Sequence, residues 1–171
     1  MDIFYDTRPC RLGSLLVAVR GDTGAVCDTY IGTAPARAVR RLRSLPSVDR
    51  VIRDRKRPAR ALTELKEYLD GRRTNITIKV SPLVGTPFQR RIWAAIASFP
   101  YGETRTYSDM ARSAGIPKAV RAAGSACGAN PTPLIVPCHR VIRGDGTFEG
   151  FSGELRIKKM LLEKETKGRI H

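Results

Sequence analysis

Residues 130–142, Asn-Pro-Thr-Pro-Leu-Ile-Val-Pro-Cys-His-Arg-Val-Ile, constrain the possible folds of this chain more than any other stretch. Its three prolines fix φ at about −65° and cannot donate a backbone hydrogen bond, and the apolar run 134–136 favours burial. Pro137 then turns the chain. We therefore expect a rigid, buried, non-helical support that presents Cys138 and His139 side by side.

A thiol beside an imidazole suggests a nucleophile. When the imidazole acts as a base, the cysteine becomes a thiolate at neutral pH. Most free cysteines, however, are small buried hydrophobic side chains without reactivity, and neighbouring side chains on an extended chain point to opposite faces. The adjacency of Cys138 and His139 alone leaves a catalytic and a structural cysteine both open.

The chain is strongly basic throughout. Its formal net charge is +15 and its pI is near 10.4. Residues 1–81 hold 17 Lys and Arg against 9 Asp and Glu, and residues 82–171 hold 14 against 7, so the excess is no basic tail. Such a charge indicates a polyanionic partner, with nucleic acid the first candidate. A merely soluble basic surface remains the alternative.

The cysteines show no spacing suited to a metal or redox site. They are Cys10, Cys27, Cys127 and Cys138, and the only histidines are His139 and His171. We therefore expect no metal, reduced thiols and a cytoplasmic, nucleoid-associated protein. No apolar run approaches membrane-spanning length, and the N-terminus lacks the layout of a signal peptide, so no membrane partner is expected.

Residues 1–81 are predicted to form a small sheet with helices. Short β-leaning runs alternate with turn clusters, and a leucine stripe at 62, 65 and 69 ends at Gly71 as a helix does. The expected strands cover 2–5, 13–19, 25–31 and 75–80, and the expected helices 34–45 and 58–69. The many arginines between 37 and 60 are interpreted as solvated helix faces and loop, with phosphate contact as the alternative.

Residues 82–86 are predicted to link this part to a helical part. Thr86-Pro87 is a favourable helix start, and Trp93 is expected in the core. A helix capped by Thr106, a break at Gly115 and a helix from Pro117 to about residue 129 have the layout of a helix-turn-helix. The small residues of its second helix suit close approach to DNA or, alternatively, burial. A last helix, about 154–166, is expected to bury Leu155, Leu161 and Leu162.

Pro137-Cys138-His139-Arg140-Val141 resembles the active-site signature of the O6-alkylguanine-DNA alkyltransferases, which move an alkyl group from DNA onto their own cysteine. The likeness covers most of the chain and is dense from 85 to 165. The matching residues, in the family's order, are Phe88, Trp93, Tyr101-Gly102, Thr106-Tyr107, Arg121-Ala122-Ala123-Gly124 and Asn130-Pro131. The closing 161–165 resembles a Leu-Leu-x-x-Glu ending, which makes Glu165 rather than Glu163 the matching acid.

The resemblance implies an α+β fold. An RNase H-like α/β domain would occupy residues 1–81, and a mostly helical winged helix-turn-helix domain with DNA-binding and alkyl-transfer roles would occupy 82–171. The implied partner is double-stranded DNA containing O6-alkylguanine, and also O4-alkylthymine. A monomer without cofactors is expected.

The resemblance also assigns roles at the reacting centre. Cys138 is the alkyl acceptor, His139 is the base acting through a water, and Glu165 orients the imidazole. Asn130 braces the turn that carries the cysteine.

Further roles concern DNA and the guanine pocket. Tyr107 is implied to turn the target nucleotide outward and Arg121 to fill the gap in the stack, with Ala122 and Gly124 on the same DNA-binding helix. The implied pocket residues are Val141, Phe151, Ser152 and Cys127.

The sequence departs from the family pattern at several places. Phe151 stands where a tyrosine is usual, and Glu149 and Glu154 replace small residues, which leaves the range of alkyl groups open. Family members that bind zinc use N-terminal Cys and His residues, and this chain has no histidine before His139, so zinc is not expected.

The chemistry agrees with these residues. The alkyl carbon on O6 of guanine is saturated, so its displacement needs a strong, polarizable nucleophile, and the base must be flipped out of the stack first. The thioether product makes each molecule act once. Two other classes remain: a DNA-binding regulator whose cysteine is structural or a sensor, and, more weakly, a cysteine hydrolase. Proteins of similar fold that lack the cysteine only bind and flip the base.

Overall fold

The computed structural model describes residues 1–147 and 155–167. The chain divides into two compact units, Met1–Val84 and Gly85–His171. The division falls inside the linker expected at residues 82–86. A sheet with helices makes up the first unit, and helices dominate the second, so the expected α+β class is confirmed.

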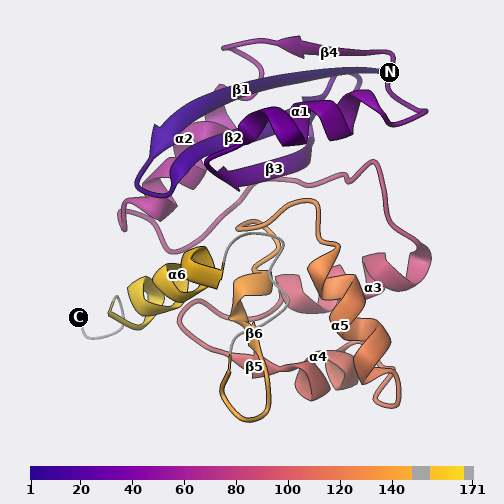
Figure 1. Cartoon of the computed structure of the whole chain (residues 1–171), viewed down its shortest axis with the longest axis vertical. Coiled ribbons are helices and arrows are strands. Elements are labelled where there is room, and N and C mark those ends of the chain that lie inside the picture. Colours follow the sequence, from indigo (N-terminus) through magenta and orange to yellow (C-terminus); the bar gives the residue numbers. More distant parts are fainter. Residues whose placement is uncertain (148–154, 168–171) are drawn as a thin grey trace. The chain divides into compact units, whose positions relative to one another are not determined.

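A four-stranded sheet with a helix on each face forms the first unit (Figure 1). Its strand order is β3-β2-β1-β4, with β1 antiparallel to β2 and parallel to β4. Alternate residues of β2 face opposite sides, as a strand requires, and Leu16 and Ala18 pack with Ala38, Val39 and Leu42 of α1. The elements are β1 (Asp2–Cys10), β2 (Gly13–Arg20), β3 (Val26–Gly32), α1 (Pro35–Arg43), β4 (Arg50–Arg53) and α2 (Ala59–Leu69).

One strand predicted for this unit was wrong, one strand was missed, and β1 is longer than expected. Residues 75–80 form no strand; Val80 makes a single isolated bridge to Val26. The alternation of apolar and polar residues in this segment indicated a strand with one buried face. In the structure the side chains of Ile76 and Ile78 are only half-buried. The fourth strand is instead β4, whose two apolar residues lie between arginines and give no signal of period two. β1 also continues through Pro9 to Cys10, although the sequence around this proline was expected to form a turn.

Helix caps predicted from the sequence are confirmed in the second unit. Thr86 forms a capping box with Gln89 at α3 (Pro87–Ala97), and Thr106 forms one with Asp109 at α4 (Tyr107–Ser113). α5 (Val120–Gly128) follows α4 across a turn at Gly115, as in a helix-turn-helix. The other elements are β5 (Arg105–Thr106), a 3-10 turn η1 (Cys138–Arg140), β6 (Val141–Ile142) and α6 (Leu155–Lys167).

Trp93 joins α3 to α5 in the core of this unit. Its ring is buried with Ile92 and Ile96, and its indole N–H donates to the Ala126 carbonyl at 2.8 Å. The same apolar cluster contains Cys138 and Val141. The reactive segment is therefore part of the hydrophobic core and does not lie on a surface loop.

Three further differences from the sequence reading are small. Cys138 begins a 3-10 turn, although a fully non-helical support was expected. α5 begins at Val120, three residues after Pro117. Leu155 is 56% exposed, so the prediction that it is buried was wrong. Within residues 1–147 and 155–167, no helix has the length and apolar character needed to cross a bilayer.

Gly85 allows the chain to enter α3 beneath Trp93. Its φ is +111°, and a Cβ atom there would lie 2.5 Å from the indole ring. We expect Gly85→Ala to lower the free energy of unfolding by about 2–4 kcal/mol, because it adds backbone strain and a clash. Gly144→Ala is the matched control, since its Cβ would meet nothing within 4 Å. Urea unfolding of both variants measures this, and equal small effects would contradict it.

Candidate active site

Asn130 ties together the loop that carries Cys138. Its side-chain amide donates to the Val136 carbonyl at 2.9 Å and to the Cys138 sulfur at 3.2 Å. Its carbonyl oxygen accepts from the backbone N–H of Thr132 at 3.0 Å. One buried amide thus fixes both ends of the proline-rich loop and places a hydrogen-bond donor on the sulfur.

The Cys138 thiol is fully buried. Burial raises its pKa to about 11, because a thiolate loses solvation there. The Asn130 hydrogen bond, the charge of Lys158 and the backbone N–H groups of Cys138 and His139 act in the opposite direction, and they offset only part of the effect.

The expectation of a resting thiolate is therefore corrected. Adjacency to an imidazole does not outweigh the loss of hydration in a closed apolar cluster. At neutral pH the sulfur carries its proton. A thiolate has to be produced by transfer of that proton during the reaction.

His139 is held by Glu165 from the last helix. Its Nε2 lies 2.6 Å from Oε1 of Glu165, and both side chains are buried. Burial lowers the pKa of His139 below its usual value, and the Glu165 carboxylate offsets this in part, so the ring is neutral at pH 7. Glu163 is exposed on another face of α6. The structure therefore brings Glu165, not Glu163, to the imidazole.

Arg140 is a buried partner of the same carboxylate, and the sequence analysis gave it no role. Its Nε and Nη2 donate to Glu165 at 3.0–3.2 Å, and its Nη1 donates to the Phe99 carbonyl at 2.6 Å. The backbone N–H of Gly102 donates to Glu165 at 3.0 Å. Glu165 is thus neutralised and fixed by partners from two segments, η1 and the turn after α3.

Lys158 is a second residue that sequence reasoning missed. It is fully buried on α6, and its ammonium donates to the Val141 carbonyl. Its positive charge opposes the rise in the pKa of Cys138 and of Cys127 that burial causes. A signal existed in the sequence: Lys158 falls in the stripe of Ile157, Leu161 and Leu162, where an apolar residue would be usual.

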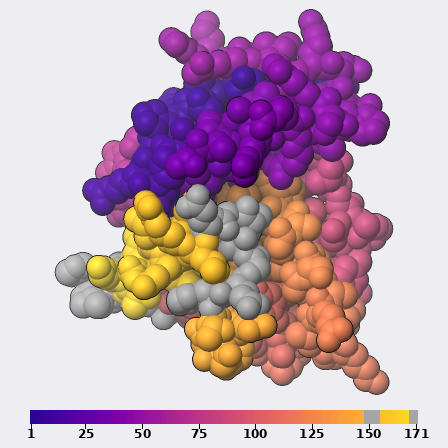
Figure 2. Space-filling view, viewed as in Figure 1, coloured from indigo at the N-terminus to yellow at the C-terminus, as the bar shows by residue number. Residues whose placement is uncertain are grey.

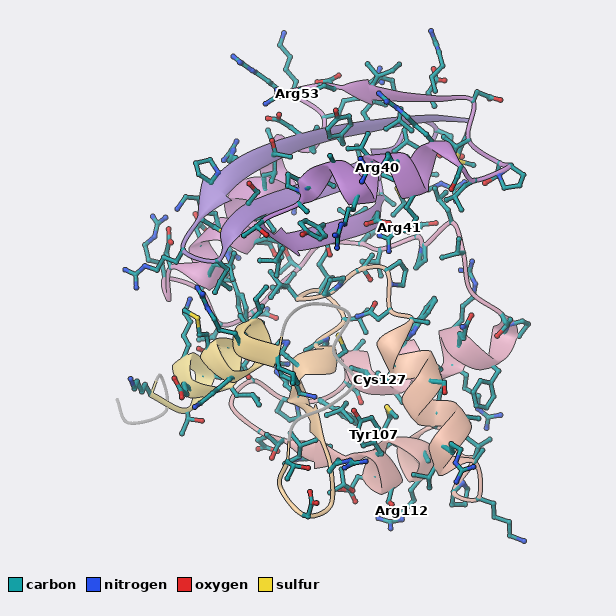
Figure 3. All side chains as sticks on the ribbon, in the orientation of Figure 1. Arg40, Arg41, Arg53, Tyr107, Arg112 and Cys127 are labelled. Carbon is teal, nitrogen blue, oxygen red and sulfur yellow. The ribbon has the colours of Figure 1, made fainter. Side chains whose placement is uncertain are left out.

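The residues expected to meet DNA lie on and beside α5. Arg121 and Ala122 are exposed, whereas Ala123, Ala126 and Cys127 are buried. The alternative of burial therefore holds for part of the helix surface, and DNA contact by the exposed part stays a prediction. Gly124 faces the Tyr107 ring, to which a Cβ would come within 3.5 Å (Figure 3 labels Tyr107).

The expected pocket residues are only partly described. Val141 and Cys127 are buried in the same cluster as Cys138, and burial raises the pKa of the Cys127 thiol. Phe151 and Ser152, with Glu149 and Glu154, lie outside the described residues. In the described part of the chain, no group of three or more His, Cys, Asp or Glu side chains is placed to hold a metal ion.

Comparison with known proteins places the site in a family. Residues 87–167 match the family model "6-O-methylguanine DNA methyltransferase, DNA binding domain". An inducible methylated-DNA–protein-cysteine methyltransferase of Bacillus subtilis is 46% identical over 102 residues, which are 60% of this chain and 56% of that protein. The bifunctional transcriptional activator and DNA repair enzyme Ada of Escherichia coli is 37% identical over 94% of this chain and 45% of its own length.

The chain thus spans about half the length of these two curated relatives. Solved structures match it over nearly their full length. The Mycobacterium tuberculosis O6-methylguanine methyltransferase has a TM-score of 0.80 and 33% identity, and the match covers 96% of this chain and 93% of that one. The structure of the M. tuberculosis protein in complex with DNA has a TM-score of 0.77, with 31% identity over 96% of this chain and 94% of that one.

The raised pKa of Cys138 can be measured directly. Thiolate absorbance of wild-type protein minus that of Cys138→Ser isolates this one group. We expect no titration step from about pH 6 to about pH 9, because burial keeps the thiol protonated beyond its ordinary range. A step below the ordinary thiol pKa of about 8.5 would contradict this account of the site.

Proposed function

We infer the function of this chain from its family, because the chain belongs to the O6-methylguanine DNA methyltransferases. It is a DNA repair protein that transfers the alkyl group of O6-alkylguanine to its own Cys138. The observation that carries this assignment is a buried thiol, braced by Asn130, in the residue before an imidazole that Glu165 holds. This arrangement supports nucleophilic displacement at a saturated carbon, for which sulfur is well suited.

The transfer requires a proton to leave the thiol. Because Nε2 of His139 is engaged with Glu165, Nδ1 is the ring nitrogen that receives the Cys138 proton, through a bridging water. The neutral, low-pKa imidazole gains a positive charge, which the Glu165 carboxylate stabilises. The Asn130 amide stabilises the developing thiolate by its hydrogen bond to sulfur.

The displacement then balances as a simple exchange. The sulfur forms a bond to the alkyl carbon while the bond from that carbon to O6 breaks, and the electron pair goes to O6. The proton held by His139 returns through water to the guanine. Unmodified guanine remains in the DNA, and Cys138 becomes a thioether, so each molecule acts once.

DNA is the partner of this reaction. The exposed side of α5, with Arg121 and Ala122, is the surface that meets the duplex, and Gly124 allows close contact with Tyr107. Tyr107 turns the target nucleotide out, Arg121 takes its place in the stack, and the flipped base enters a pocket that includes Val141. The M. tuberculosis protein, solved with DNA, supports this partner. O4-alkylthymine is a second substrate. We further propose a monomer that works in the cytoplasm on the nucleoid.

The first test is the mass of the intact protein after incubation with duplex DNA that contains O6-methylguanine. We expect a gain of one methyl group per chain, located on Cys138, because this thiol receives the Asn130 hydrogen bond and precedes the proposed base in the sequence. Cys138→Ser should gain none, and Cys127→Ser, the buried neighbour, should still gain one. An unchanged wild-type mass with intact DNA binding would favour the regulator hypothesis instead.

The second test separates Glu165 from Glu163 on the same helix. His139→Ala should slow single-turnover transfer by about 10²–10⁴-fold, the usual contribution of a general base, and Glu165→Gln should slow it at least tenfold. Glu163→Gln, with its exposed side chain, is the matched control and should react like wild type.

The pH dependence and the stability of these variants complete this test. Wild-type transfer should fall as the pH drops through the lowered pKa of His139, because a protonated ring accepts no proton, and His139→Ala should lose this limb. Glu165→Gln should also lower the unfolding free energy by about 3–5 kcal/mol, since Arg140 is left buried without its counter-charge. A fully active His139→Ala protein would refute the relay.

A further inference from the structure

All the net charge of the first unit is concentrated in one segment. Residues 37–60 contain ten Lys and Arg, nine of them arginines, and only two acids, Asp49 and Asp54. The remaining residues of Met1–Val84 contain seven cations and seven acids. A general need for solubility would spread the charge over the unit and does not account for this concentration.

Ion pairs leave most of this segment unneutralised. Four of its arginines pair with carboxylates: Arg41 with Asp28, Arg50 with Asp2, Arg53 with Asp6, and Arg57 with Asp54. Six cations form no ion pair with any described residue, and all six are exposed: Arg37, Arg40, Arg43, Arg55, Lys56 and Arg60. In Figure 2, side chains of this purple segment project from the surface of the unit.

Three of the six lie on α1, where their spacing brings like charges together. Like charges three residues apart, Arg37 with Arg40 and Arg40 with Arg43, repel each other. The helix dipole favours cations in the last turn, which accounts for Arg40 and Arg43. It disfavours Arg37, the third residue of a helix whose first turn has no acid. Apolar packing uses the other side of α1, through Ala38, Val39 and Leu42.

We propose that the outer face of α1, formed by Arg37, Arg40 and Arg43, is a second DNA-contacting surface that binds phosphates of the duplex backbone. The guanidinium groups suit phosphate oxygens, to which they donate in pairs. The three Cα atoms span about 9 Å of helix axis, so their long side chains reach more than one phosphate. Contacts of this kind carry no sequence information, as suits a protein that searches ordinary DNA for rare lesions.

The choice of DNA over another polyanion rests on the proposed function, which already brings the chain to a duplex. An anionic membrane would attract the same arginines. The face has no large apolar side chain of α1 to insert into a bilayer, because Val39 and Leu42 are buried and the only exposed apolar side chain of the helix is the methyl group of Ala36.

The experiment measures binding of the full chain to undamaged duplex DNA against salt concentration. Arg37→Gln/Arg40→Gln/Arg43→Gln is compared with Arg11→Gln/Arg72→Gln/Lys79→Gln, which removes equal charge at exposed sites of the same unit outside the segment. Each phosphate contact contributes about 0.9 to the slope of log Kd against log salt, so the α1 triple should lower it by about 2–3. The control should lower it by less than about 1.

Further measurements keep the proposal separate from the alkyl-transfer assignment. Undamaged DNA makes the slope independent of transfer, and methyl uptake by the α1 triple at saturating damaged DNA should equal that of wild type. Arg37→Lys/Arg40→Lys/Arg43→Lys should retain the wild-type slope, which excludes misfolding as the cause. Equal slopes for the α1 triple and the wild type, or equal losses in triple and control, would overturn the proposal. The proposal would also be overturned if the α1 triple lost binding to phosphatidylglycerol vesicles while its slope of log Kd against log salt for DNA stayed unchanged.

Discussion

The second unit depends most on the interactions made by the carboxylate of Glu165. It is buried, it lies against His139, and it receives hydrogen bonds from Arg140 and from the Gly102 backbone. These groups come from α6, from η1 and from the turn after α3, so one anion joins segments that are distant in sequence. A buried carboxylate is costly unless every lone pair is satisfied, and here a guanidinium and two further groups satisfy it. The proposed orientation of His139 and the stability of the unit therefore depend on the same carboxylate.

Burial also sets the chemistry of the thiol. The cluster that surrounds Cys138 raises its pKa and lowers that of His139, so both groups are neutral in the resting protein. A neutral pair costs less to bury than a thiolate with an imidazolium. Charge separation then occurs only when the proton moves, at a sulfur that already receives the Asn130 hydrogen bond. The site combines low reactivity at rest with a short path to a nucleophile.

Local signals in the sequence predicted what is locally determined. Thr86 and Thr106 cap helices because the cap and its partner are three residues apart, and Pro137 to Val141 carries the family signature in five consecutive residues. Failures occurred where distant contacts decide. β4 forms because it pairs with β1. Leu155 is exposed because α6 buries a different set of residues, among them Ile157 and Leu161. The pKa of Cys138 follows from burial among distant residues, which its position next to His139 in the sequence does not reveal. Arg140 and Lys158 are cations whose burial becomes visible only when their partners, Glu165 and Val141, are in place.

The proposed transfer should occur once per molecule, because its product is a thioether. Removal of the alkyl group from sulfur would need a second displacement at the same saturated carbon, with the thiolate as leaving group. A thiol whose pKa burial raises is a poor leaving group, because the charge of its thiolate is not solvated there. His139 cannot help, because it would have to activate a water on the far side of the alkyl group. The burial that keeps the thiol protonated at rest thus also disfavours its departure as a thiolate, so the proposed thioether should persist.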